Sequence, residues 1–118
     1  MIGVMTDGKT TPPKPVVLRP RPDAIRDLVR QIAIDTSNIA WSKHALERMA
    51  ERDITDAVVL EVLRRGVPKG EIEAGANPGE WKVKMVRTIR GRREVGVVVI
   101  AIHNRRLLVK TAEWEDLT

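Results

Sequence analysis

The chain has 118 residues, a length that fits one compact domain and leaves little room for a second. It has no cysteine, which excludes disulfides, thiolate metal sites and a cysteine nucleophile, and no apolar run is long enough to cross a bilayer. Lysine and arginine outnumber aspartate and glutamate by 21 to 16, giving a net charge of +5, so a polyanionic partner such as nucleic acid is expected. The first residues lack the apolar core of a signal peptide, and we expect a cytoplasmic protein with no membrane partner.

Residues 1–22 are expected to form a tail. The stretch TTPPKPVVLRPRP holds five of the seven prolines, together with Lys14, Arg19 and Arg21. Proline at this density prevents a continuous helix and favours extended polyproline II conformations. Two interpretations stay open for this segment, a disordered leader or a basic arm for nucleic acid or a partner protein. Residues 23–118 are expected to form a single domain.

Three helices are predicted next along the chain. The first begins at Asp23 and presents an apolar arc to the core. That arc consists of Ala24, Ile25, Leu28, Val29 and Ile32. Ser42 is a plausible N-cap for the second helix, and Thr55 caps the third, which ends at Gly66. The apolar positions of the third helix cover more than half of its circumference, so we expect it to be deeply buried.

From Val67 onward the apolar period changes to that of strands. A short strand and a loop are predicted first, and WKVKMVRTIRG then alternates apolar and basic residues. VGVVVIAIH is apolar on both faces and predicts a central strand, and RLLVKTAEW predicts a third clear strand. The expected fold is α+β, with N-terminal helices packed on one face of a three- to four-stranded antiparallel sheet.

The second helix carries a basic row at every fourth residue, formed by His44, Arg48 and Arg52. One interpretation is a solvated face on which Glu47 and Glu51 pair with neighbouring arginines. The other is a phosphate site, in which the arginines grip phosphate oxygens and the histidine exchanges a proton near neutral pH. The two interpretations remain open at this stage.

A second basic row is predicted on the alternating strand. Lys82 and Lys84 share one face by the period of two, and they either solvate that face or line an RNA groove. Cleaving RNA requires a proton to leave the 2′-hydroxyl, a neutralised phosphorane and a proton for the 5′-oxygen. Cationic side chains can supply the neutralisation, so no metal or other cofactor is expected.

The C-terminal end of the chain is acidic. For Glu113, Glu115 and Asp116 we expect a solubilising terminus in preference to a metal site. No histidine or further carboxylate near them has the spacing that a metal site requires. Trp81 and Trp114 could stack on bases or fill the core and its rim, and for Trp81 we favour the core.

These residues together resemble a known bacterial family. HALERMAERDITDAVVLEVLRRG, a basic strand, VGVVVIAIHN and LLVKTAEWED look like a family catalogued as a domain of unknown function and grouped with RelE-like and BrnT-like toxins. Its signature resembles His-x-x-x-Arg-Met, a capped helix and a final strand with Thr and an aromatic residue. The matching positions are His44, Arg48, Met49, Thr111 and Trp114. The resemblance covers roughly residues 40–116.

The resemblance implies a small RelE/barnase-like fold and an endoribonuclease of the mRNA-interferase type. RelE-type toxins commonly use a catalytic tyrosine, which this chain lacks, whereas barnase-like relatives use Glu, Arg and His. The implied catalytic residues are Glu113, His44 and Arg48, with Arg87 as the other candidate for the arginine. The implied RNA- and phosphate-binding residues are Arg52, Lys82, Lys84, Arg87, Thr111 and Trp114. The implied partners are RNA and an acidic antitoxin, and the alternative is a non-catalytic nucleic-acid-binding or protein-interaction module.

Overall fold

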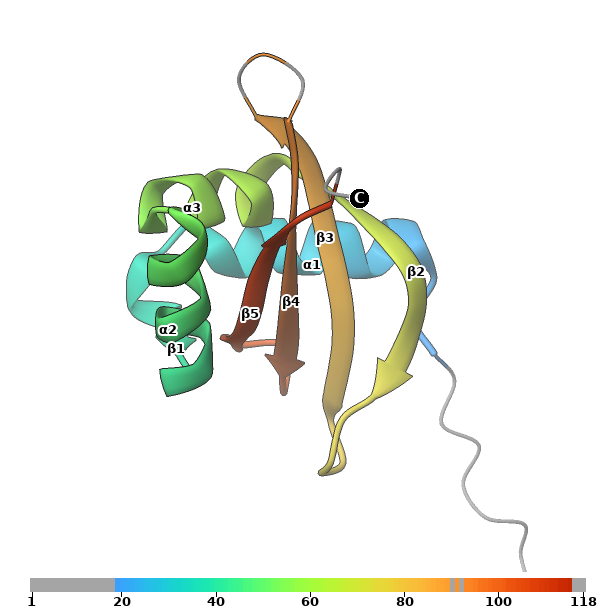
Figure 1. Ribbon diagram of the computed structural model, residues 1–118. Helices are drawn as coiled ribbons and strands as arrows, with labels where there is room; N and C mark the ends of the chain where they lie inside the picture. The colour runs from blue at the N-terminus through green and yellow to red at the C-terminus, as the bar shows by residue number, and fades with distance from the viewer. Residues whose placement is uncertain (1–18, 90, 92, 116–118) are drawn as a thin grey trace, which may run out of the picture.

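The computed structural model describes residues 19–89, 91 and 93–115, so most of the predicted tail lies outside the described residues. The elements are α1 (Pro22–Ala33), a 3₁₀ helix η2 (Thr36–Asn38), β1 (Ile39–Trp41), α2 (Lys43–Arg52), α3 (Asp56–Arg65), β2 (Val67–Ala74), β3 (Glu80–Ile89), β4 (Arg93–Ile102) and β5 (Arg106–Trp114). The α+β class is confirmed, with the helices before the four long strands (Figure 1). Within the described ranges, no helix is both long and apolar enough to span a membrane.

The sheet has five strands in the order β1-β5-β4-β3-β2. Strands β2 to β5 form the predicted antiparallel meander, but β1 pairs with β5 in parallel, which makes the sheet mixed. The prediction of three to four antiparallel strands was therefore wrong. Strand β1 has only three residues, with Ile39 buried, Ala40 exposed and Trp41 half-buried, and one such alternation is too short to register as a pattern.

Two predicted helix caps are confirmed. The hydroxyl of Ser42 accepts a hydrogen bond from the N–H of Ala45 at 3.0 Å, and the hydroxyl of Thr55 accepts one from the N–H of Val58 at 3.2 Å. Helix α1 begins at Pro22, one residue before the predicted start, because proline suits the first helical position, where the missing N–H is not needed.

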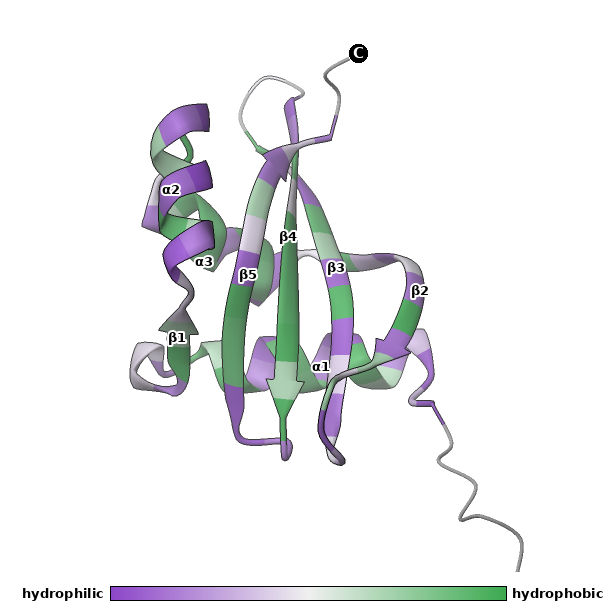
Figure 2. Cartoon of the chain, turned by 60° about the horizontal axis from the view of Figure 1, so that its bottom comes forward, coloured by the Kyte–Doolittle hydropathy of each residue, from purple (hydrophilic) through white to green (hydrophobic). Residues whose placement is uncertain are grey.

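The helices cover one face of the sheet. Helix α1 crosses behind the strands and contacts both β2 and β5, whereas α3 packs on β3 and β4 (Figure 1). Alternate residues of β4 are fully buried beneath them, namely Val95, Val97, Val99 and Ala101. We call this the helix-covered face. The prediction that β4 is apolar on both faces holds, and Figure 2 shows an almost continuous hydrophobic strand, but its other face is only half-buried at Val98, Ile100 and Ile102.

Helices α1 and α3 cap each other through arginines. The guanidinium of Arg30 on α1 donates to the carbonyl of Gly66, at the end of α3, at 2.8 Å. In return Arg64 on α3 donates to the carbonyl of Ala33, at the end of α1, also at 2.8 Å. The last carbonyls of a helix have no partner within the helix, so these bonds satisfy both C-termini. Part of the arginine content is thus used to join the helices.

Candidate functional site on the open sheet face

The face of the sheet opposite the helices carries ordered rows of side chains. Cross-strand pairing places Lys84, Val98 and Thr111 side by side on β3, β4 and β5, and Lys82 beside Ile100 in the next row. Lys82 and Lys84 therefore share a face, as predicted. We call this surface, with Glu113 in the row on the other side of Lys84, the open face.

A glycine creates space in the middle of the open face. Gly96 on β4 lies opposite Glu113 on β5, and the carboxylate of Glu113 reaches to 3.7 Å from the ammonium of Lys84 on β3. A Cβ atom on Gly96 would stand 2.5 Å from the Glu115 carboxylate and 2.9 Å from the Lys84 chain. Both distances are shorter than van der Waals contact, so these groups can meet there only because residue 96 has no side chain.

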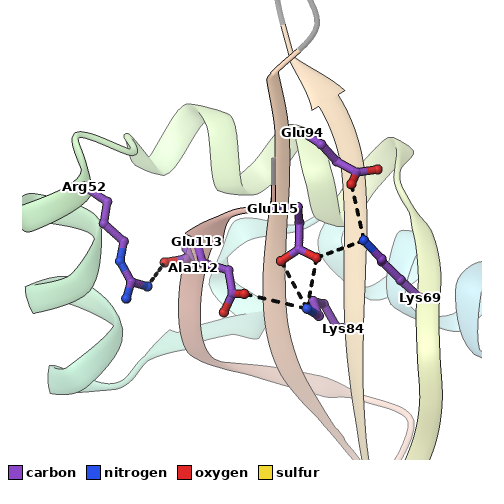
Figure 3. Close-up of polar contacts among 7 residues, drawn as sticks. All are labelled: Arg52, Lys69, Lys84, Glu94, Ala112, Glu113 and Glu115. Carbon is purple, nitrogen blue, oxygen red and sulfur yellow. Dashed lines mark hydrogen bonds and ion pairs between the residues drawn. The ribbon is translucent and has the colours of Figure 1, made fainter. Parts of the chain in front are cut away.

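Glu115 fills that space. Its backbone N–H donates to the carbonyl of Glu94 at 2.7 Å, which extends the pairing of the two strands by one bond beyond Trp114. Its carboxylate accepts hydrogen bonds from Lys84 at 3.0 and 3.1 Å and from Lys69 at 3.2 Å (Figure 3). The side chain is only 5% exposed. The prediction that Glu115 belongs to a solubilising terminus was therefore wrong, because the carboxylate turns back over Gly96 instead of entering solvent.

The surroundings of Glu115 stabilise its charged form. Burial alone raises the pKa of the Glu115 carboxyl, but hydrogen bonding with Lys84, Glu113 and Lys69 outweighs that effect, and the pKa is lowered. The hydrogen bond to Glu115 and the charge of Glu94 raise the pKa of the Lys69 ammonium. We call these five residues, Lys69, Lys84, Glu94, Glu113 and Glu115, the charge cluster.

Of the three residues in the basic row of α2, Arg52 contacts β5. Its guanidinium donates to the carbonyl of Ala112 at 2.8 Å, one residue before Glu113 on β5 (Figure 3). Arg48 instead pairs with Glu51 on the same helix at 2.6 Å. Arg48 thus follows the surface-pairing interpretation and Arg52 binds a backbone carbonyl of β5, while the phosphate site on this row stays a prediction.

His44 lies at the other end of the same helix. Its side chain is exposed, and no described residue forms a hydrogen bond with the imidazole. The eight residues from His44 to Arg52 correspond to about 12 Å along a helix axis. The N–H of Ser42 donates to the carbonyl of Val109, so α2 starts beside the middle of β5 and ends near Ala112. His44 is therefore accessible but not in contact with Glu113.

Two of the predicted site residues lie on the helix-covered face. Arg87 and Trp114 are both in register with Val95, whose side chain points into the core. Arg87 pairs with Glu61 of α3 at 3.0 Å. The ring of Trp114 is covered by the guanidinium of Arg93, 4.0 Å from the ring centroid. The structure does not bring Arg87 and Trp114 together with Lys82, Lys84, Thr111 and Glu113.

A hollow of about 480 Å³ lies beside Trp114 on that same side of the sheet. It is lined by Thr55, Ala57, Val58, Glu61, Ile89, Arg93 and Trp114. The nitrogen of the Trp114 ring donates to the carbonyl of Arg52 at 2.8 Å, which ties the end of β5 to the end of α2. Trp114 thus joins three elements, and its exposed part borders a space separate from the charge cluster.

A smaller hollow, about 240 Å³, lies on the open face beside the charge cluster. It is lined by Lys69, Gly70, Glu71, Glu73, Lys82, Val83, Lys84 and Val98. It forms where the pairing of β2 with β3 shifts between Lys69 and Glu73. Lys69 and Glu115 were missed by sequence reasoning. The signal for Glu115 was its spacing of two from Glu113, whereas Lys69 faces Lys84 only through pairing that the weak pattern of β2 did not reveal.

The described residues contain no group of three histidine, aspartate or glutamate side chains placed to hold a metal ion. What the open face offers is acid–base and electrostatic chemistry. Glu113 can accept a proton, the Lys84 ammonium lies 3.7 Å from it, and the Arg52 guanidinium binds the carbonyl of the preceding residue, Ala112.

Comparison with known proteins identifies one family. Neither a curated protein nor a solved structure matches the chain. A family model described as "Domain of unknown function (DUF4258)" matches residues 41–114, which is more than half of the chain and includes every strand from β2 to β5. The matched range contains the open face, α2 and the charge cluster up to Trp114, and leaves out α1 and Glu115. The chain belongs to the DUF4258 family.

Proposed function

We propose that the protein is a metal-independent endoribonuclease that acts as the toxin of a toxin–antitoxin pair, with a fold of the RelE/barnase-like superfamily. The observation that carries this proposal is the position of the Glu113 carboxylate on the open face. It lies 3.7 Å from the Lys84 ammonium and is 39% exposed, and the preceding residue, Ala112, accepts a hydrogen bond from Arg52 (Figure 3). The cluster around Glu113 combines two ammonium groups with three carboxylates, and the ammonium groups of Lys69 and Lys84 are the cations that an anionic RNA backbone would contact there.

The reaction requires no group beyond these side chains, the RNA and solvent water. Glu113 accepts the proton of the 2′-hydroxyl, and the 2′-oxygen attacks the adjacent phosphorus. Lys84 and Arg52 balance the charge of the phosphorane. The bond from phosphorus to the 5′-oxygen then breaks, and that oxygen takes a proton from solvent water. The products are a 2′,3′-cyclic phosphate and a 5′-hydroxyl.

The remaining predicted residues divide by position. The RNA extends from Lys84 across Thr111 toward α2, where Arg48 and the exposed imidazole of His44 contact its backbone away from the scissile phosphate. Lys82 contributes a further phosphate contact beyond Lys84. Arg87 and Trp114 act from the helix-covered face, where they hold β3 and β5 in place.

The test is cleavage of RNA by the purified protein, followed by analysis of the new ends. We expect 2′,3′-cyclic phosphate ends in the presence of EDTA, and a loss of at least about a hundredfold in rate for Glu113→Gln. Glu47→Gln on the exposed side of α2 is the matched control and should cleave normally. Equal rates for the two variants would show that Glu113 is not the base.

A non-catalytic RNA-binding or protein-binding module is the second candidate. It is favoured by one observation: Lys84 already pairs with both Glu113 and Glu115, an arrangement that also suits a purely structural role. This candidate predicts salt-dependent binding of an oligonucleotide, or co-purification of an acidic antitoxin-like protein, with no new RNA ends.

A further inference from the structure

We propose that Lys69 and Lys84 form a binding site for one RNA phosphodiester, and that the carboxylate of Glu115 occupies this site until RNA displaces it. The inference rests on the proposed RNA substrate but not on catalysis. It assigns a ligand to Lys69, which lies one strand beyond the residues used in the proposed reaction.

The site is built for an anion. Three hydrogen bonds from two ammonium groups, all between 3.0 and 3.2 Å, hold the two oxygens of Glu115. A phosphodiester also presents two non-bridging oxygens that carry one negative charge between them. The bare backbone of Gly96 leaves room for either group to lie flat on the sheet. The carboxylate of Glu115 thus stands where the phosphate oxygens would bind.

Exchange of the two anions leaves the charge of the cluster unchanged. Glu94, at 3.5 Å from Lys69, and Glu113, at 3.7 Å from Lys84, remain as neighbours in both states. Since a carboxylate and a phosphodiester each carry one negative charge, displacement creates no unpaired lysine. Glu115 follows the last residue of β5, so its side chain can turn away without disturbing the paired strands before it.

The location of the site also fits a bound strand of RNA. Lys84 contacts both Glu113 and Glu115, so a phosphate held by Lys84 and Lys69 lies directly beside the proposed base. The 240 Å³ hollow next to this site, which Lys82 also lines, leaves space for the RNA to continue toward β2. The RNA would then cross the strands from the α2 side of β5 to the opposite edge of the sheet.

The test uses a fluorescent 2′-O-methyl RNA oligonucleotide, which binds but cannot be cleaved because it lacks the 2′-hydroxyl. Removal of the competing carboxylate by Glu115→Gln should lower the dissociation constant about fivefold, the usual size of the effect of an ion pair whose lysines are accessible to solvent. Glu94→Gln makes the same change of charge and touches only Lys69, so it should tighten binding by less than about twofold. Lys84→Met should weaken binding.

The result that overturns the inference is a Glu115→Gln variant that binds no more tightly than Glu94→Gln. Absence of binding by the unaltered protein also overturns it. Cleavage is measured separately with the unmodified RNA of the same sequence. If that RNA stays intact while Glu115→Gln still tightens binding, the nuclease proposal fails and the phosphate site stands.

A measurement on the unaltered protein covers the case in which Glu115→Gln does not fold. The carbon resonance of the Glu115 carboxyl is followed by NMR while the 2′-O-methyl oligonucleotide is added. Displacement moves the resonance and returns the pKa of Glu115 toward its ordinary value, because the hydrogen bonds from Lys84 and Lys69 are lost. An unchanged pKa at saturation contradicts displacement.

Discussion

The two faces of the sheet use positive charge in different ways. On the helix-covered side, Arg30 and Arg64 donate to backbone carbonyls at the ends of α3 and α1, and Arg87 pairs with Glu61. On the open face, Lys69 and Lys84 bind carboxylates that could be replaced by another anion. The arginines on the helix-covered side bind groups within the fold, whereas the two lysines on the open face are accessible to solvent.

This difference changes what the net charge of +5 can be taken to mean. A guanidinium has several donors in one plane and satisfies helix carbonyls well, so a chain rich in arginine need not bind nucleic acid. The charges relevant to a polyanion are those left on an accessible surface. Substitutions on the two faces should therefore separate loss of stability from loss of binding.

The largest effect on stability is expected from Arg30→Met. Arg30 donates to the carbonyls of Gly66 and Arg65, and its loss leaves the end of α3 without these partners. We expect unfolding free energy to fall by about 2 kcal/mol, or a melting temperature lower by roughly 10 °C. Binding of the 2′-O-methyl oligonucleotide by the folded fraction should not change.

Arg65→Met is the matched control for this prediction. It removes the same charge from α3 at the residue whose carbonyl accepts a hydrogen bond from Arg30, but the exposed Arg65 side chain forms no hydrogen bond with the described residues. Its melting temperature should stay within about 2 °C of the unaltered protein. Equal destabilisation by the two variants would mean that charge, and not the carbonyl contacts, explains the loss.

The next effect is a dependence of stability on pH that arises from Glu115. Its pKa is lowered in the folded protein, so its stabilisation is present above the unfolded value of about 4.3 and is lost as pH falls through the folded pKa. Glu115→Gln should cost about 1 kcal/mol at pH 7 and progressively less below about pH 4. Thermal melts of both proteins at pH 7 and pH 3 provide the measurement, and a constant difference would refute the link.

Much of this fold could be predicted because it depends on local pattern. The helix caps at Ser42 and Thr55 and the alternating burial of β3 each depend on residues close together in the sequence. The structure confirms these predictions. Strand β1 was missed because its three residues gain their structure from pairing with Leu107 to Val109, nearly seventy positions later. Short parallel strands carry no turn signal that would reveal the partner.

The site was less accessible to prediction for a related reason. The shared face of Lys82 and Lys84 follows from the period of two, which also puts Arg87 on the other face, but the position of Trp114 required the cross-strand register. The pairing of β4 with β5 shifts after Val98, which changes the face of every residue after Lys110. The role of Glu115 depends on the absent side chain of Gly96 on a neighbouring strand.

A smaller effect is expected at Lys82, which lines the 240 Å³ hollow but has no ion pair with the described residues. If it contacts one phosphate, Lys82→Ala should reduce the slope of log affinity against log salt concentration by about 0.7 to 1. Anisotropy titrations at several salt concentrations measure this slope. Arg65→Met, which lies away from the open face, should leave the slope unchanged.

The smallest effect is expected at the ion pair between Arg48 and Glu51, which decides between the two interpretations of the α2 row. Both side chains are partly exposed, so Glu51→Gln should lower stability by less than about 0.5 kcal/mol. If Arg48 only pairs with Glu51 on the surface of the helix, the Glu51→Gln variant and the control Glu47→Gln will bind RNA equally well, since both remove one negative charge from α2. If Arg48 grips a phosphate, releasing it from Glu51 will tighten binding more than the control does. A difference between two exposed glutamates one turn apart on the same helix would then place the RNA along α2, where His44 could reach it.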